Sequence, residues 1–288
     1  MIEFRQPTSD DADLIKNLLL KSESQSCDYT AGNIIGWNFQ YNLSYAVIKN
    51  CLVLRLGDKN IFGFPKGEKY MSVLEYLMKE YPDCGFFGLE KNECDIIEKL
   101  FPSAFSFLPD RASFDYVYKR DELAELKGKK FHSKRNHISF FEKNFNWTYE
   151  ELTSDNMQEC LLMNEKWYEA NVSKDPLGIE TERKVLNRFF DLYNILDFKG
   201  GILRVDGDVV AFTFGERLNS NTFVTHYEKA FSEIRGAYPM INMLFASKTL
   251  CEYEFINRED DTGSEGLRKA KMSYCPDYLV EKYTAVRV

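Results

Sequence analysis

One stretch of the sequence indicates the fold most clearly: residues 222–276, which read TFVTHYEKAFSEIRGAYPMINMLFASKTLCEYEFINREDDTGSEGLRKAKMSYCP. An expected strand that contains His226 and Glu228 leads into the pair Arg235 and Gly236, and an amphipathic helix follows. A second expected strand then ends in the charged run NREDD at residues 257–261. A turn with free backbone amides that opens a helix between two strands often holds an anion or an acyl carbonyl. The stretch therefore predicts a strand–helix–strand unit with a site where the second strand ends.

The composition is that of a globular protein. The chain has 288 residues, of which 44% are hydrophobic and 28% are charged, and its formal net charge is −8. This length suits one large domain or two of about 140 residues each. The seven cysteines form no CxxC pair, which favours reduced thiols, and no run reaches the 18 or so apolar residues of a membrane span. We therefore expect a cytoplasmic protein without a transmembrane segment.

The order of the expected elements occurs twice. Residues 2–23 and 147–167 each combine a short strand, a cap rich in Ser, Thr and Asp, and a helix. Further along, residues 52–64 and 201–212 each form an expected hairpin. Chance agreement remains an alternative, because this order is common, but the repeat favours two copies of one mixed α/β unit. We expect an N-terminal unit over residues 1–120, a basic linker helix over 121–146, and a C-terminal unit over 147–288 that holds the site.

The linker contains the conspicuous basic surface of this acidic chain. Residues 127–143 include six Lys or Arg and a single acid, Glu142. An apolar stripe at helical spacing would direct the basic side chains to the solvated face. Two interpretations stay open: contact with nucleic-acid phosphates, or an ordinary solvated helix face. The stripe consists of Phe131, Ile138, Phe141 and Phe145. The candidates for phosphate contact are Lys129, Lys130, Lys134 and Arg135.

Several familiar catalytic motifs are missing from the sequence. There is no HExxH pattern and no Cys/His spacing typical of zinc. There is also no GxSxG elbow, no GxxxxGK[ST] phosphate loop and no GxGxxG after an expected strand. We therefore expect no metal site and no nucleotide hydrolysis.

Five motifs link the chain to known proteins. They are KKFHSKRNHI at 129–138, GGILRVDGDVVAFTFGE at 200–216, HYEKA at 226–230, INREDD at 256–261 and GLRKAKMSY at 266–274. With them the chain resembles two tandem units of the GCN5-related N-acyltransferase fold. More narrowly, it resembles a family of unknown function that is found alone and as the C-terminal part of phosphatidylglycerol lysyltransferases. That family is related to the peptidoglycan aminoacyltransferases, which move an amino acid from aminoacyl-tRNA to an amine or a hydroxyl.

The resemblance implies a function. The donor would be aminoacyl-tRNA, without a cofactor, and the acceptor would be a small molecule, a peptide or a lipid headgroup. Lysyltransferase members have a multispan membrane region before this domain, and no such region is expected here. Members of the fold that use acetyl-CoA hold its pyrophosphate in a loop of the form Q/R-x-x-G-x-G/A. The corresponding run is EIRGAY at 233–238, in which Glu233 would repel the pyrophosphate and Tyr238 would crowd the amides, so acetyl-CoA is the less favoured donor.

The charged residues of the C-terminal unit can be given roles. The proposed catalytic groups are His226, Glu228, Arg258 and Lys271. His226 and Glu228 are two apart on a strand, so both would lie on one face and one would act as general base. Arg258 would brace the site, and Lys271 would stabilise an oxyanion. The proposed substrate-binding residues are Glu216, Arg235, Gly236, Glu259, Asp260, Asp261 and Arg268. The acids among them suit an ammonium group.

Each of these roles has a plainer alternative. A lone His in a strand is more often a structural hydrogen-bonding group, and Asp260 and Asp261 also suit an Asx turn before a helix cap at Ser264. Trp37 is expected in the core, with a stacking platform for the terminal adenine of the tRNA as the alternative. The favoured function is an aminoacyltransferase that moves an amino acid, such as lysine, from aminoacyl-tRNA to an amine or hydroxyl. The alternatives are a CoA-dependent small-molecule N-acyltransferase and a catalytically silent ligand-binding module of the same fold.

Overall fold

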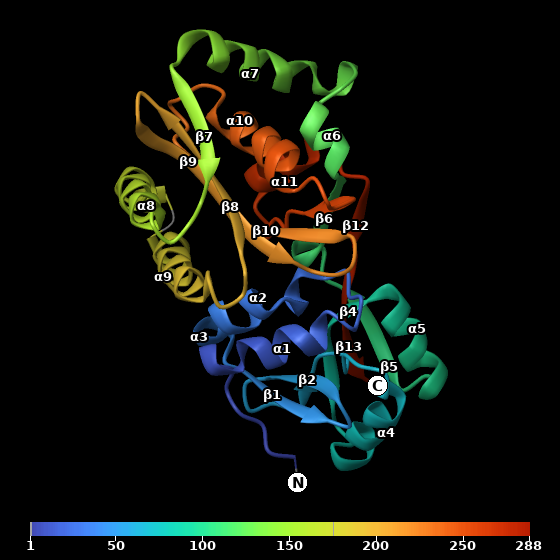
Figure 1. Cartoon of the computed structure of the whole chain (residues 1–288). Helices are drawn as coiled ribbons and strands as arrows, with labels where there is room; N and C mark the ends of the chain where they lie inside the picture. The colour runs from blue at the N-terminus through green and yellow to red at the C-terminus, as the bar shows by residue number, and fades with distance from the viewer. Residues whose placement is uncertain (1, 175) are drawn as a thin grey trace.

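The computed structural model describes residues 2–174 and 176–288, and it contains two mixed β-sheets (Figure 1). The first sheet has the strand order β1 (Leu43–Ile48), β2 (Cys51–Leu56), β3 (Ile61–Phe62), β4 (Gly85–Glu90), β13 (Lys282–Arg287) and β5 (Phe105–Pro109). The second has the order β7 (Trp147–Glu151), β8 (Lys199–Val205), β9 (Asp208–Arg217), β10 (Thr222–Ala230), β11 (Phe255–Asn257), β6 (Asp115–Lys119) and β12 (Tyr278–Val280).

The two sheets repeat one topology. Strands β1, β2 and β3 are antiparallel, β3 and β4 are parallel, and β13 is antiparallel to both β4 and β5. Strands β8, β9 and β10 are likewise antiparallel, β10 and β11 are parallel, and β6 is antiparallel to both β11 and β12. The bridge between Arg5 and Tyr45 beside β1 takes the place of β7 beside β8. The prediction of two mixed α/β units is confirmed.

The repeat is aligned differently from the sequence prediction. The single parallel junction of each sheet matches β3 with β10, so β2 corresponds to β9 and the β1–β2 hairpin to the β8–β9 hairpin. The predicted match of residues 52–64 with 201–212 is therefore one strand out of step. Both β2–β3 and β8–β9 are antiparallel pairs of consecutive strands, so the local pattern alone does not reveal the shift.

Each unit donates one strand to the other. Strand β6 follows directly after the strands of the first sheet in sequence but lies in the second sheet, and the C-terminal β13 lies in the first (Figure 1). The two units therefore do not separate at the predicted boundaries, because residues 115–119 and 282–287 cross them.

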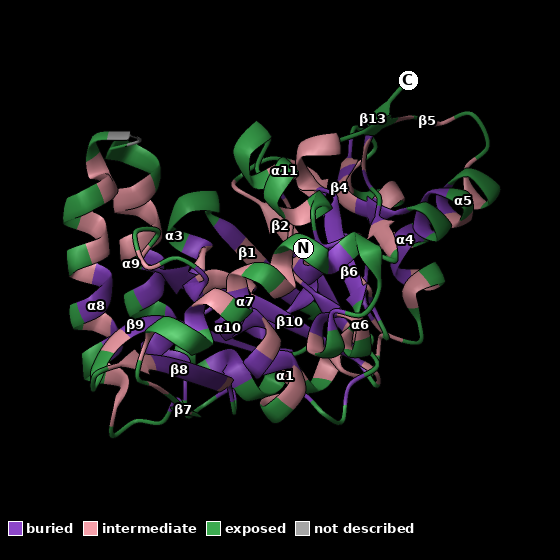
Figure 2. Cartoon of the chain, turned by 90° about the horizontal axis from the view of Figure 1, so that it is seen from above, coloured by how far each residue is buried: buried purple, intermediate pink, exposed green. Residues whose placement is uncertain are grey.

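The helices form three layers around the two sheets. Between the sheets lie α1 (Ala12–Leu19), α2 (Ala31–Gly36), α8 (Met157–Asn171) and α9 (Pro176–Leu192), whose apolar side chains share one core with both sheets. The outer face of the first sheet is covered by α4 (Tyr70–Glu80) and α5 (Lys91–Leu100). The outer face of the second is covered by α6 (Arg120–Glu125), α7 (His132–Asn144) and α10 (Ala237–Leu244). The shorter α3 (Asn38–Tyr41) follows α2, and α11 (Glu265–Met272) follows β11. The strands are largely buried, whereas the outer faces of the helices are exposed (Figure 2).

The expected linker helix is α7, and it belongs to the second unit. Phe131, Ile138 and Phe141 are buried in the core beneath it, and Phe145 packs against that core, as the apolar stripe predicts. Among the described residues, no helix combines the length and hydropathy that a membrane span needs.

A candidate active site between the two units

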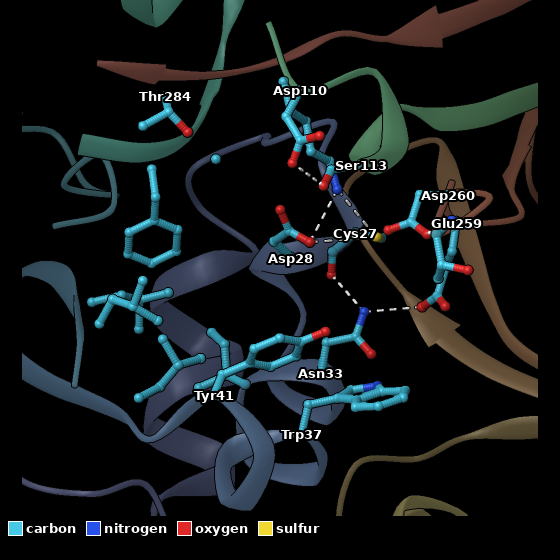
Figure 3. Close-up of a pocket in the computed structure, with 18 of the residues that line it drawn as sticks. Cys27, Asp28, Asn33, Trp37, Tyr41, Asp110, Ser113, Glu259, Asp260 and Thr284 are labelled. Carbon is cyan, nitrogen blue, oxygen red and sulfur yellow. Dashed lines mark hydrogen bonds and ion pairs between the residues drawn. The ribbon is translucent and has the colours of Figure 1, made fainter. Parts of the chain in front are cut away.

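A cavity of about 350 Å³ lies where the two units meet (Figure 3). One wall, called here the acid wall, consists of Asp28, Glu259, Asp260 and Lys282. The other wall, called here the apolar wall, consists of Ile34, Trp37, Leu43, Leu54, Leu56 and Phe87. The apolar wall comes from α2 and the strands of the first sheet, whereas Glu259 and Asp260 come from the loop after β11. The cavity thus needs both units.

The exchanged strands meet at the acid wall. Asp115 begins β6 and Lys282 begins β13, and the Lys282 ammonium lies 2.8 Å from the Asp115 carboxylate. Both side chains are buried, and Lys282 also contacts Asp28 at 3.0 Å. Burial opposes the charge of Lys282, but Asp115 and Asp28 raise its pKa well above the usual value. One cation is therefore shared between two carboxylates. Burial raises the pKa of Asp115, although Lys282 opposes this rise, and Asp28 is the carboxylate of this group that lines the cavity.

A second group of the same kind holds Glu259. The ring of His226 lies between Glu259, 2.8 Å from Nδ1, and Glu216, 2.9 Å from Nε2. Burial opposes protonation of His226, but its hydrogen bonds to the two carboxylates raise its pKa to about 9. Asn33 donates to the same Oε1 of Glu259 at 2.9 Å, and the Gly32 amide donates to Glu216 at 2.8 Å. One imidazolium again serves two carboxylates, so Glu259 presents negative charge to the cavity.

Asp260 is the acid at the wall that lacks a cation. Within the part of the chain that the structure describes, its carboxylate makes no ion pair, and Oδ1 accepts a hydrogen bond from the Thr262 amide at 2.8 Å. Burial raises the pKa of Asp260 to about 7, although Lys282 opposes this rise. A carboxyl group with a pKa near neutrality, such as that of Asp260, suits proton transfer.

Lys271 does not face the cavity. Its ammonium donates to the backbone carbonyls of Arg258 and Asp260, and burial lowers its pKa.

Asp261 has a structural role. Its side chain is fully buried and forms two hydrogen bonds with Arg268, at 2.8 and 3.0 Å, and further ones with Arg111 and Tyr116. The hydrogen bonds from Arg268, more than any other contact, hold the pKa of Asp261 well below its usual range. Its other role is the turn that the alternative interpretation expected, since it accepts from the Gly263 amide and Ser264 caps α11. Asp261 and Arg268 therefore brace the loop and do not line the cavity.

His226 and Glu228 do not share a face, contrary to the prediction. The pairing of β10 with β9 shifts at His226, and this bulge breaks the alternation of side chains. The His226 ring packs on Phe189 of α9, whereas Glu228 accepts a hydrogen bond from Asn242 of α10 and pairs with Arg258 at 2.8 Å. Glu228 and Arg258 thus lie on the α10 face of the sheet, behind the wall of the cavity.

The predicted anion loop lies beneath α7. Gly236 has φ +97°, and a Cβ there would clash with the carbonyl oxygen of His137 in α7. The Arg235 guanidinium stacks over Phe140 of the same helix at 4.3 Å. Close packing by α7 explains this glycine, and the structure does not bring Arg235 or Gly236 to the cavity.

Much of the predicted basic surface is engaged within the chain. Lys130 pairs with Glu122 at 2.7 Å, and Arg135 donates to the carbonyls of Leu126 and Gly128. Lys134 lies over the Tyr274 ring at 3.8 Å, and burial, aided by Arg258, lowers its pKa to about 8. Lys134 and Arg135 are thus not on the solvated face, contrary to the expectation. Lys129 is exposed.

Sequence reasoning missed the residues that the first unit contributes. Asp28, Asn33 and Lys282 are isolated polar residues without a motif, and Trp37, expected in the core, lines the cavity. Lys282 offered a usable signal. It is a lysine at the start of the partly apolar strand KYTAVR. The described residues contain no group of three His, Cys, Asp or Glu side chains placed to hold a metal ion.

The model of the phosphatidylglycerol lysyltransferase C-terminal family matches residues 21–286. The chain belongs to this family.

Related structures agree with the family. A conserved protein of unknown function from Bacteroides thetaiotaomicron is 39% identical, with a TM-score of 0.93 over 100% of both chains. The C-terminal domain of a putative lysylphosphatidylglycerol synthetase from Agrobacterium fabrum has the same fold, with a TM-score of 0.66 and 13% identity over 97% of this chain and 92% of that one. An uncharacterised Mycoplasmoides gallisepticum protein is 24% identical over 176 residues, which are 60% of this chain and 56% of that protein.

Proposed function

We propose that this member of the family is an aminoacyltransferase that takes an amino acid from aminoacyl-tRNA and transfers it to an amine or hydroxyl acceptor. The observation that carries the proposal is the acid wall, where Asp28, Glu259 and Asp260 line the cavity while Lys282 and His226 are each shared between two carboxylates, and where Asp260 makes no ion pair within the described residues. Such a wall attracts an ammonium group, which every aminoacyl ester has next to its reactive carbonyl. The family relationship to a phosphatidylglycerol lysyltransferase domain supports the same chemistry.

The residues of the wall can share the work of one transfer. Glu259 is fixed through Oε1 by His226 and Asn33, so its other oxygen can bind the α-ammonium group of the donor. Asp260, with its pKa near 7, can take the proton from the attacking amine or hydroxyl. The acceptor then forms a bond to the ester carbonyl carbon, the bond to the tRNA 3′ oxygen breaks, and the proton passes to that oxygen. His226 and Glu216 act as positioning residues behind Glu259.

Two other groups fit this reaction poorly. Burial raises the pKa of the Cys27 thiol well above its usual value, with Asp115 acting in the same sense, so it does not supply a thiolate nucleophile. The Arg235–Gly236 turn, the expected place for a CoA pyrophosphate, is covered by α7. A transfer between aminoacyl-tRNA and acceptor requires neither a cofactor nor a metal, and we propose none.

The proposal is tested by incubating the full chain with a pool of charged tRNAs and candidate amine and hydroxyl acceptors. Mass spectrometry should find uncharged tRNA together with a new amide or ester, and Asp260→Asn should reduce the yield of that product. Tight binding of acetyl-CoA in calorimetry, with charged tRNA left intact, would instead support the CoA-dependent alternative. Ligand binding without any product would support the silent module.

Contact with tRNA through the basic surface remains part of the proposal, and its test uses Lys129. Charge reversal at Lys134 or Arg135 would also disturb their packing, whereas Lys129→Glu changes an exposed side chain only. We expect Lys129→Glu to weaken tRNA binding. The slope of the logarithm of the binding constant against the logarithm of salt concentration should fall by about one phosphate contact. Lys79→Glu, on α4 of the other unit, is the matched control.

A further inference from the structure

The two walls of the cavity differ in chemistry. Glu259 and Asp260 lie together on one side, and Trp37 and Tyr41 lie together on another (Figure 3). Tyr41 also lines the cavity, and its ring centroid lies 6.0 Å from that of Trp37. The other residues of the apolar wall are aliphatic apart from Phe87. The apolar wall contains no carboxylate. A ligand that fills the cavity therefore has a cationic end and an apolar end.

The remaining acid of the cavity does not change this division. Asp110 lines the cavity as well, but it is exposed, and its carboxylate accepts from the Ser113 hydroxyl at 2.6 Å and from the Ala112 amide at 3.3 Å. These bonds cap the turn Arg111–Ser113. Asp110 is thus already occupied and solvated, whereas Trp37, Leu56 and Phe87 on the apolar wall are half-buried and present apolar surface to the cavity.

We propose that the cavity selects an amino acid with an apolar side chain, which lies against Trp37, Leu56 and Phe87 while its α-ammonium group meets the acid wall. This inference rests on the proposed function and adds the class of the donor amino acid. An aliphatic or aromatic side chain gains from burial against such a wall in proportion to its area. A lysine side chain directed the same way would place its ε-ammonium group against apolar side chains, where the acid beside Gly88, Asp28, is already paired with Lys282 at 3.0 Å.

The test is calorimetric titration of the full chain with leucinamide, phenylalaninamide, alaninamide and lysinamide. Like the aminoacyl ester of the donor, these amides have an α-ammonium group and no carboxylate. We expect leucinamide or phenylalaninamide to bind at least about tenfold more tightly than lysinamide, a difference of about 1.4 kcal/mol. N-acetylleucinamide, which lacks the ammonium group, should not bind measurably.

Two variants locate the effect. Trp37→Ala should weaken the binding of leucinamide about tenfold and leave alaninamide unchanged. Phe39→Ala is the matched control, because Phe39 is an exposed aromatic residue two positions away that does not line the cavity. Equal or tighter binding of lysinamide, through an ammonium group over Trp37 or otherwise, overturns the inference about the side chain.

The outcomes also separate this inference from the proposed function. If lysinamide binds best and Asp260→Asn abolishes its binding, the acid wall works as proposed and only the apolar preference is wrong. If no amide binds and no charged tRNA is consumed, the proposed function itself fails.

Discussion

Asp260 and Asp261 are adjacent carboxylates with opposite surroundings. Asp260 faces the cavity and makes no ion pair with any residue that the structure describes, whereas Asp261 is fully buried among Arg268, Arg111 and Tyr116. Side-chain charge therefore has a different use at each position. The first is available to a ligand, and the second holds the loop that presents it.

This contrast predicts that the same substitution affects different properties at the two positions: activity at Asp260 and stability at Asp261. Asp260→Asn keeps the acceptor for the Thr262 amide and removes a buried charge, so we expect equal or higher stability above pH 7. We expect a loss of about 2–3 kcal/mol in transition-state binding, the scale of a hydrogen bond to a charged group. Asp261→Asn breaks a buried ion pair and should lower the free energy of unfolding by roughly 3 kcal/mol. Urea denaturation and the transfer assay measure the two quantities. Similar behaviour of the two variants would contradict the assignment.

His226 predicts a pH dependence of stability. Its pKa rises from 6.5 in the unfolded chain to about 9 in the folded protein. The folded state therefore binds the extra proton, and its stabilisation is complete below pH 6.5 and disappears as the pH rises through 9. The difference in unfolding free energy between the wild type and His226→Gln should shrink by up to about 3 kcal/mol over this range. Taking the difference removes the contribution of Lys134, which also titrates there, and an Asp260→Asn background removes that of Asp260, whose pKa depends on Glu259. A difference independent of pH would show that His226 is neutral.

At the scale of elements, the exchange of β6 and β13 between the two sheets stabilises the fold. Lys282→Met would leave Asp115 buried without its cation, so we expect a loss of about 3–5 kcal/mol in the free energy of unfolding. Lys16→Met is the control, because its pair with Asp197 lies at the surface and should contribute less than about 1 kcal/mol. The double variant Lys282→Met with Asp115→Asn should recover part of the loss. Equal effects of the two lysine substitutions in chemical denaturation would exclude a structural role for the crossing.

The elements also show what the sequence can reveal. The charged run after β11 marked one wall of the cavity, because charge at the end of a buried strand is visible locally. The bulge at His226 was not visible, since one extra residue in β10 leaves no compositional trace. The residues that contact the acid wall from distant parts of the chain also could not be predicted from the sequence. Asn33 and Glu259 are 226 residues apart, and only the tertiary fold brings them together.

At the scale of the whole molecule, strand exchange joins the two units into one folding unit. Neither sheet is complete without a strand from the other half, and one core between the sheets contains side chains of both units. We therefore expect a single cooperative unfolding transition. A variant that keeps only Trp37 reports on the first unit, and one that keeps only Trp147 reports on the second. The two fluorescence midpoints in urea should coincide; separate midpoints would show that the units unfold independently.

The most direct test of the account is the position of a bound donor. A crystal structure of the full chain with a non-hydrolysable 3′-aminoacylamino-3′-deoxyadenosine would show where the aminoacyl group lies. The account predicts its α-ammonium group within hydrogen-bonding distance of Glu259 or Asp260, in the cavity that Lys282 and Trp37 also line. An aminoacyl group bound at the Arg235–Gly236 turn or on the α10 face beside Glu228, with the cavity unoccupied, would contradict it.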